Sequence, residues 1–349
     1  MICSNRKQAR LELPAGPNTD FFDAGGHSLT ALRLAALIER STGRDVALRD
    51  LLSFPTPRAL ADRLAVSEVV EYEHAHLVPM AAPPPSDHAD RTSLNAPVFC
   101  VHGAGGNVVH FTDIADVIGR RRPFIALQAR GADGRGEPHA TLDEMADAYA
   151  AEIEQVHAAP APLVLAGYSA GGLVAWEIAR RLVDRGHAVA GVLLLDTYHP
   201  TVRPRSRGIA ELTREAASMG LAEAGGKVWR RLRNTAAEVS YRRQRRNGEV
   251  EVQGEARHQQ MMEAIGGAFR AHTVQPCPVP VVLLSTTDQS SAFAHVPVDR
   301  GWTGETPDLR VIPVPGEHHD LLVGEVGRQT ASTIDALAAE LVDAMSGVG

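Results

Sequence analysis

The sequence is poor in cysteine. Its 349 residues contain three, Cys3, Cys100 and Cys277. An odd number at scattered positions, without metal-ligand spacing, argues against a disulfide framework and against a zinc site. We therefore expect reduced, mostly buried thiols and no bound metal.

Long apolar runs are absent as well. No run approaches the roughly 20 residues that a membrane span needs. The N-terminal residues 1–7 carry charge but no apolar stretch follows them, which is not the pattern of a secretory signal. These absences predict a cytoplasmic protein with no membrane partner.

The chain also lacks an excess of positive charge. Its formal net charge is -7 at pH 7, which disfavours nucleic acid as a partner. Residues 201–260 depart from this balance, with thirteen Lys and Arg against seven Asp and Glu. The 44% hydrophobic and 22% charged content is typical of a globular protein.

The N-terminal part, residues 1–66, has the pattern of a small helical bundle. Apolar residues recur at helical spacing over residues 28–40, and Gly43 provides a stop. Thr56 and Pro57 are a capping residue and a first helical residue, and predict a second helix start. Residues 67–95, which include three consecutive prolines, predict an interdomain linker.

Residues 96–349 form the second predicted domain. Short apolar runs alternate with helical patterns there, which is typical of a mostly parallel sheet wrapped by helices. The segment 201–272 interrupts this alternation and is helical in character, so we expect a lid over the carboxyl edge of the sheet. The expected strands are 98–101, 124–127, 163–166, 192–195, 281–284 and 309–314.

Residues 167–171, Gly-Tyr-Ser-Ala-Gly, follow the third expected strand and precede a helical pattern. Strand, tight turn and helix are the context of a nucleophile elbow, in which small residues let the backbone at the serine adopt a strained turn. This pattern predicts that Ser169 attacks an acyl group on an α/β-hydrolase fold. The alternative is a glycine-rich turn with an idle serine.

A nucleophilic serine needs a histidine base and a carboxylate that orients the base. Asp196 ends the fourth expected strand and is favoured as the carboxylate, with Asp288, after the fifth strand, as its rival. The last strand leads to His318 and His319. We favour His318, because Gly316 allows a turn that returns this imidazole towards the serine.

The negative oxygen that forms during acyl transfer needs two backbone N–H donors. Ala170, at the start of the helix, is one candidate. Ala104, in the loop after the first expected strand, is the other. His102 opens the same loop rather than ending the last strand, so we assign it a structural role.

A second serine, Ser28, follows two glycines and a histidine at the start of a helix, where its hydroxyl is exposed and an attached phosphate would meet free N–H groups. An ordinary helix cap is the alternative. Residues 21–29, Phe-Phe-Asp-Ala-Gly-Gly-His-Ser-Leu, resemble peptidyl carrier domains of nonribosomal peptide synthetases. This resemblance implies 4'-phosphopantetheine attached to Ser28. Only about twenty residues precede the motif, which leaves little room for the first helix of that family. Three alternatives follow: the carrier is truncated, it begins upstream of residue 1, or it has lost its arm.

Residues 96 to about 345 resemble the type I thioesterase domains of the same synthetases, in an α/β-hydrolase fold with a helical lid. The matching stretches are 99–106, 167–172, 195–198, 301–302 and 316–318. The resemblance implies partners: upstream synthetase modules and carrier proteins, a phosphopantetheinyl transferase, and an acyl or peptidyl thioester.

These patterns together predict a thioesterase that releases an acyl or peptidyl chain from its own carrier through Ser169, His318 and Asp196. Two alternatives remain open: an interaction module that presents an acyl group to another enzyme, and an editing hydrolase. The basic lid segment fits recognition of an acidic acyl chain or of the phosphate, or a solvated helical face.

Overall fold

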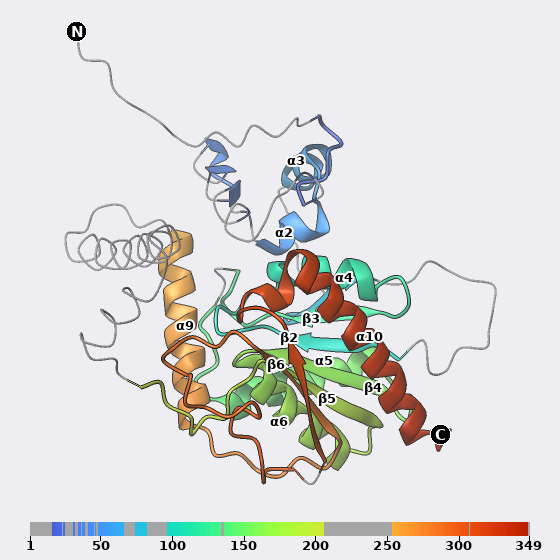
Figure 1. Cartoon of the computed structure of the whole chain (residues 1–349). Helices are drawn as coiled ribbons and strands as arrows, with labels where there is room; N and C mark the ends of the chain where they lie inside the picture. Colours follow the sequence, from blue (N-terminus) through green and yellow to red (C-terminus); the bar gives the residue numbers. More distant parts are fainter. Residues whose placement is uncertain are drawn as a thin grey trace. The chain divides into compact units, whose positions relative to one another are not determined.

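The computed structural model divides the chain into two compact units, Met1–Tyr72 and Glu73–Gly349 (Figure 1). Among the described residues, no helix is long and apolar enough to cross a membrane. The structure describes residues 16–22, 24, 31, 34–35, 37–38, 41–44, 46, 48–65, 74–81, 96–133, 136–205, 253–306 and 308–347.

The first unit is helical. The described residues between 31 and 42 are helical, and Gly43 follows them with a φ of 69°, a conformation that glycine adopts without strain. Helices α2 (Leu48–Ser53) and α3 (Pro57–Ala65) complete it. The Thr56 hydroxyl accepts a hydrogen bond from the Ala59 N–H, so the predicted cap at the start of α3 forms.

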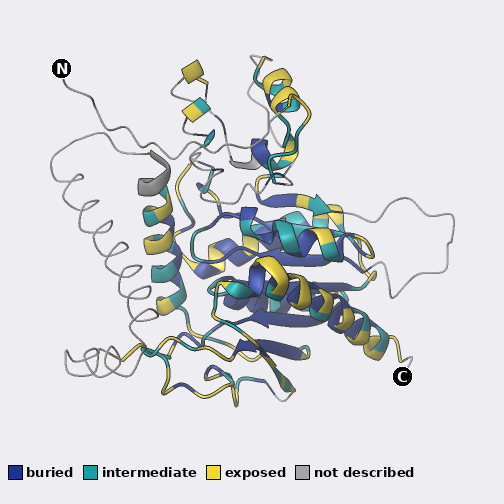
Figure 2. Ribbon diagram, turned by 45° about the horizontal axis from the view of Figure 1, so that its top comes forward, coloured by how far each residue is buried: buried dark blue, intermediate teal, exposed yellow. Residues whose placement is uncertain are grey.

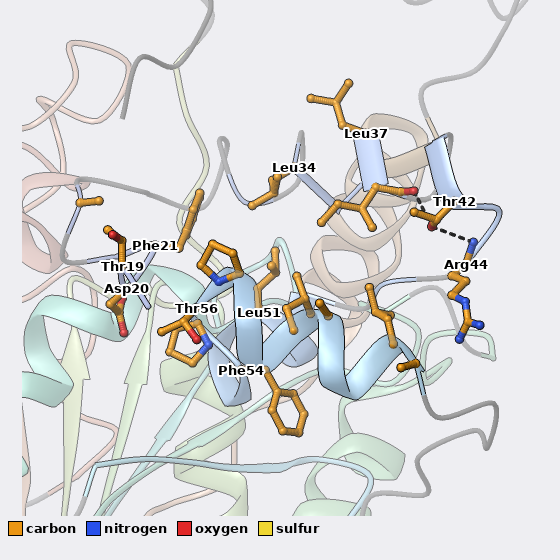
Figure 3. Close-up of a pocket in the computed structure, with 18 residues that line it drawn as sticks. Thr19, Asp20, Phe21, Leu34, Leu37, Thr42, Arg44, Leu51, Phe54 and Thr56 are labelled. Carbon is orange, nitrogen blue, oxygen red and sulfur yellow. Dashed lines mark hydrogen bonds between the residues drawn. The ribbon is translucent and has the colours of Figure 1, made fainter. Parts of the chain in front are cut away.

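The helices of this unit surround an apolar cavity of about 650 Å³ (Figure 3). Leu51 of α2, Phe54 directly after α2, and Leu60 of α3 line it. Leu34 and Leu37 line it from the preceding helical residues, and 53% of Leu37 is exposed. Among the described residues, the apolar core of this unit is therefore open.

The second unit is built on a seven-stranded sheet with the order β1-β3-β2-β4-β5-β6-β7 (Figure 1). Neighbouring strands are parallel except β1 and β3, which pair antiparallel. The carboxyl ends of β2, β4, β5, β6 and β7 thus meet at one edge. The strands are β1 (Leu77–Ala81), β2 (Val98–Val101), β3 (Phe124–Leu127), β4 (Leu163–Tyr168), β5 (Val189–Leu195), β6 (Val281–Thr286) and β7 (Leu309–Val314).

Helices cover both faces of this sheet (Figure 1). Helices α4 and α10 pack together on one face, and α5 and α6 on the other. The central strands β2, β4, β5 and β6 are buried along their whole length, as expected for parallel strands covered on both sides, whereas the edge strands β1 and β7 are partly exposed (Figure 2). The remaining elements are η1 (Val109–Phe111), α4 (Thr112–Ile118), α5 (Leu142–Val156), α6 (Gly171–Asp184), α9 (Gln253–Ala271), η2 (Asp320–Leu322) and α10 (Gly324–Met345).

The structure corrects one expectation and partly describes another. Strand β1 lies inside the range 67–95 that we expected to be a linker, because its backbone pairs with β3 from Leu77 to Ala81. Of the expected lid, residues 201–272, the structure describes 201–205 and 253–272, and α9 is helical as predicted. Cys100 and Cys277 are buried free thiols, and Cys3 lies outside the described residues.

Candidate active site

Ser169 lies in the turn between β4 and α6, as the sequence predicts. Its φ is 55°, which is rare for a residue with a side chain. Its N–H donates to the Leu195 carbonyl at 2.9 Å, and its carbonyl accepts from the Gly172 N–H. The turn is therefore fastened to the end of β5, one residue before Asp196.

Glycines make this turn possible. A Cβ at Gly167 would collide with the Gly171 carbonyl, and one at Gly171 with the His102 carbonyl. A Cβ at Gly172 would collide with the Thr197 hydroxyl. The close approach of these backbones holds Ser169 at the carboxyl edge of the sheet.

Asp196 and His318 form a hydrogen-bonded pair at the same edge. Asp196 follows β5, His318 follows β7, and the His318 Nδ1 lies 2.8 Å from the Asp196 Oδ2. An ionised carboxylate can only accept, so Nδ1 carries the proton and Nε2 is left as the basic nitrogen. This is the arrangement that a general base requires.

The carboxylate of Asp196 is 1% exposed and has further donors. Arg300 Nε donates to Oδ1 at 2.9 Å, and Thr286 donates to Oδ1 through its N–H and to Oδ2 through its hydroxyl. Burial raises the pKa of Asp196, but the hydrogen bond from His318, the charge of Arg300 and the Thr286 hydroxyl outweigh it and lower the pKa. Asp196 is thus held in its ionised form.

The rival residues take other places. Asp288 is exposed and accepts a hydrogen bond from its neighbour Thr287. The His319 Nδ1 lies 3.4 Å from the Tyr168 hydroxyl, whereas His318 is the residue that contacts Asp196. The structure therefore pairs the two residues that the sequence favours.

Tyr168 connects this pair to the serine turn. Its ring stacks on His318 with centroids 4.7 Å apart, and its hydroxyl donates to the His318 carbonyl. Ser169 is the next residue along the chain. Its own hydroxyl makes no hydrogen bond with any described residue, so the link between the serine turn and His318 runs through Tyr168.

The predicted N–H donors belong to two different loops. Ala170 caps α6 directly after Ser169, and Ala104 lies in the loop after β2. Within the described residues neither N–H donates a hydrogen bond, which leaves both free for an oxyanion. Helix α9 lies against this loop, because a Cβ at Gly105 would come within 2.6 Å of the His258 ring.

His102, in the same loop, is fully buried. Its Nε2 lies 2.7 Å from the Tyr149 hydroxyl and its Nδ1 2.7 Å from the Gly103 carbonyl. Burial lowers the pKa of His102 to about 4. Both nitrogens are engaged within the core, which agrees with a structural role.

One group of side chains has ligand types and spacing that suit a metal ion: Asp143, Glu177 and His272. Arg181 already contacts both carboxylates, at 2.6 Å from Asp143 and 2.8 Å from Glu177. His272 Nε2 lies 3.1 Å from Glu177. The arginine supplies the positive charge that a cation would bring, so we interpret this cluster as a connection between α5, α6 and the end of α9.

Sequence reasoning missed two residues of the site, Thr286 and Arg300. Thr286 ends β6, so its position at a strand end was a usable signal. Arg300 lies in a loop distant from any strand end, and no local pattern marks it. Its neighbour Trp302 donates from Nε1 to the Thr197 carbonyl and thereby fastens this loop to the segment after Asp196.

The fold and the site define a serine hydrolase of the α/β-hydrolase class. Residues 96–247 match the thioesterase domain family, and residues 6–64 match the phosphopantetheine attachment site family. The chain therefore combines a carrier domain with a serine-hydrolase-type thioesterase domain, and the carrier match indicates a covalently attached phosphopantetheine.

Relatives support this assignment. A malpinin synthetase from Mortierella alpina is 36% identical over 52% of this chain, and a dimodular nonribosomal peptide synthase from Bacillus subtilis is 36% identical over 54%. The matched part spans 2% and 8% of those proteins, so this chain corresponds to a small portion of each.

Solved structures show the same fold. A four-domain nonribosomal peptide synthetase superposes with a TM-score of 0.58 at 21% identity, over 93% of this chain and 24% of that one. The RedJ thioesterase from the prodiginine pathway of Streptomyces coelicolor has a TM-score of 0.51 at 20% identity, over 74% of this chain and 96% of that one.

Proposed function

We propose that the chain releases an acyl or peptidyl group, carried as a phosphopantetheine thioester, by an acyl-enzyme mechanism at Ser169. The contact between His318 and Asp196, beside the serine turn, is the observation that carries this proposal. The fused carrier and the relatives named above favour nonribosomal peptide biosynthesis in the cytoplasm. Upstream synthetase modules and carrier proteins would deliver the group.

Each site residue has a role in the chemistry. The Ser169 Oγ attacks the thioester carbonyl carbon while His318 Nε2 takes its proton, and Asp196 stabilises the imidazolium. The N–H groups of Ala104 and Ala170 donate to the oxyanion. The C–S bond then breaks, and His318 returns the proton to the departing sulfur.

The second half of the reaction releases the product. Water, a hydroxyl or amine of the acyl group itself, or a hydroxyl of a separate acceptor molecule gives its proton to His318 and attacks the ester carbonyl. The bond to Ser169 Oγ breaks, and the hydroxyl regains its proton from His318. The product is an acid, a cyclised chain or a transferred ester, according to the nucleophile.

Ser28 is the proposed attachment point of phosphopantetheine, and it lies outside the described residues. The described residues before it show how the motif is anchored: the Phe21 N–H donates to the Pro55 carbonyl at 2.8 Å. When attached by a phosphopantetheinyl transferase, the group supplies the thiol that holds the acyl chain.

The test follows the acyl adduct by intact mass after treatment with a phosphopantetheinyl transferase and acyl-coenzyme A donors. We expect wild-type protein to release the acyl group, and Ser169→Ala to retain it on the carrier with release slowed at least about 1,000-fold. Ser28→Ala should take up no phosphopantetheine adduct yet still cleave a thioester supplied in solution. Ser332→Ala, at an exposed serine of α10, is the control. Wild-type release by Ser169→Ala would refute the proposal.

A further inference from the structure

Arg300 shares an unusual backbone conformation with two residues of the site. Among the described residues, three that are not glycine have a positive φ: Ser169 at 55°, Asp196 at 48° and Arg300 at 53°. Such strain persists where the surrounding structure enforces it, and it gathers at functional sites. The Arg300 backbone is held on both sides, since its N–H donates to the Pro297 carbonyl and its carbonyl accepts from the His199 N–H.

The guanidinium of Arg300 is fully buried against the catalytic carboxylate. Its Nε and Nη2 lie 2.9 and 2.8 Å from the Asp196 Oδ1. Its Nη2 also donates to the Thr286 carbonyl at 2.6 Å, and its Cζ lies 4.9 Å from the centre of the Tyr198 ring. The planar guanidinium is held by Asp196, by the Thr286 carbonyl and by the Tyr198 ring, so it has a single orientation.

These contacts divide the two oxygens of Asp196 between different partners. Oδ1 accepts from Arg300 and from the Thr286 N–H, whereas Oδ2 accepts from the Thr286 hydroxyl and from His318. If the carboxylate rotated, the hydrogen bonds of both oxygens would break together. Arg300 and the Thr286 N–H hold Oδ1, and this keeps Oδ2, on the other side of the carboxylate, directed towards His318.

We propose that Arg300 is a positioning residue of this site, which orients the Asp196 carboxylate towards His318 and balances its charge. The inference rests on the proposed function, in which His318 acts as a base. Arg300 itself contacts neither the Ser169 hydroxyl nor the His318 ring among the contacts of the described residues.

The positive charge of Arg300 determines the direction in which the pH profile of activity should move when Arg300 is replaced. Its positive charge offsets part of the negative field that Asp196 exerts on the His318 ring. Without that charge the protonated imidazole is favoured, so activity should be lost at a higher pH. Among the described residues, Tyr168, Tyr198 and His319 face this pair, and the carboxylates of Glu317 and Asp320 lie in the same loop as His318. All five are unchanged in the variants below.

The experiment compares two substitutions at Arg300 with the same two at Arg122. Arg122 is also fully buried and pairs with a carboxylate, that of Asp335, at 2.7 Å and away from the site. Arg300→Met removes both the charge and the planar guanidinium, whereas Arg300→Lys removes the planar guanidinium and keeps the charge. Arg122→Met and Arg122→Lys report the cost of disturbing a buried arginine elsewhere.

We expect Arg300→Met to lower kcat/KM about 100-fold and to move the acidic limb of its pH profile up by about one unit, after correction for the folded fraction. Arg300→Lys should lower kcat about 10-fold and leave the limb in place. The Arg122 variants should lose stability but keep kcat and the profile. A wild-type pH profile in Arg300→Met, or wild-type kcat in Arg300→Lys, would overturn the proposal.

A readout without turnover separates this inference from the proposed function. The ring signals of His318 can be followed by nuclear magnetic resonance as the pH is varied in each variant. Arg300→Met should shift the signal of the His318 Nδ1–H, which donates to Asp196, even if no thioester is cleaved. If Arg300→Met shows this shift but the wild-type protein cleaves no thioester, the positioning role of Arg300 stands and the proposed reaction is refuted. The absence of a shift would refute the role alone.

Discussion

At the scale of residues, Asp196 is constrained by both its backbone and its hydrogen bonds. It is buried, has a positive φ, and accepts hydrogen bonds from Thr286, Arg300 and His318. Burying a carboxylate is costly unless it is paired and hydrogen-bonded. These donors offset that cost and fix the direction in which its charge acts.

We predict that Asp196→Asn lowers kcat by about 1,000- to 10,000-fold, since an amide nitrogen cannot accept the His318 Nδ1–H and the wrong ring nitrogen would carry the proton. Steady-state cleavage of an acyl thioester in solution measures this. Asp288→Asn, at the exposed rival, should stay within about twofold of wild type. The opposite pattern would assign the carboxylate to Asp288.

At the scale of elements, the connection between β4 and α6 is what brings the serine to the edge of the sheet. The start of α6 lies so close to the loop after β2 that Gly171 faces the His102 carbonyl directly. Backbone cannot move aside as a flexible side chain can. The helix start therefore tolerates only glycine there.

Gly171→Ala should destabilise the protein by about 3 kcal/mol, because its methyl group would overlap backbone in a packed region. Gly267→Ala is the matched control within α9. A Cβ there meets nothing within 4 Å, so alanine should stabilise the helix by about 0.5–1 kcal/mol. Urea unfolding of both variants measures the difference. Equal stabilities would contradict this account of the turn.

At the scale of the whole molecule, buried histidines make the stability of the fold depend on pH. His76, His102 and His139 surround Tyr149, and all three are at most 5% exposed. Burial lowers the pKa values of His102 and His139 to about 4 in each case. Repulsion from His76 and His139 adds to this effect at His102, and repulsion from Arg130 and His76 adds to it at His139. The folded protein keeps the rings of His102 and His139 neutral while the unfolded chain would protonate them.

The free energy of unfolding should therefore be highest above pH 6.5 and fall as the pH decreases from 6.5 towards 4, because in that window the unfolded state binds protons that the folded state does not. His102 alone contributes about 3 kcal/mol to the change, from a pKa of 6.5 to about 4. Urea titrations between pH 4.5 and 7.5 test this. The free energy of unfolding of His102→Gln should depend less on pH than that of wild type. If it depends on pH equally strongly, His102 does not cause the effect.

The local patterns of the sequence were sufficient to predict six of the seven strands. Runs such as 192–195 consist of apolar residues that a covered parallel strand buries on both faces. The missed strand, β1, is the apolar run Leu77–Ala81, which contains Pro79 and stands just before the three prolines of the expected linker. Proline disfavours a strand assignment, and the pairing with β3 that makes this segment a strand is a contact with residues later in the chain.

The sequence by itself determined the elements and the candidate residues of the site, because a nucleophile elbow and a carboxylate or histidine after a strand are local patterns. Only the tertiary structure decided which candidates meet. His318 reaches Asp196 because β5, β6 and β7 are hydrogen-bonded neighbours in register, and Arg300 approaches the same carboxylate from a loop more than a hundred residues away. Contacts of that kind depend on the path of the whole chain, and no short segment encodes them.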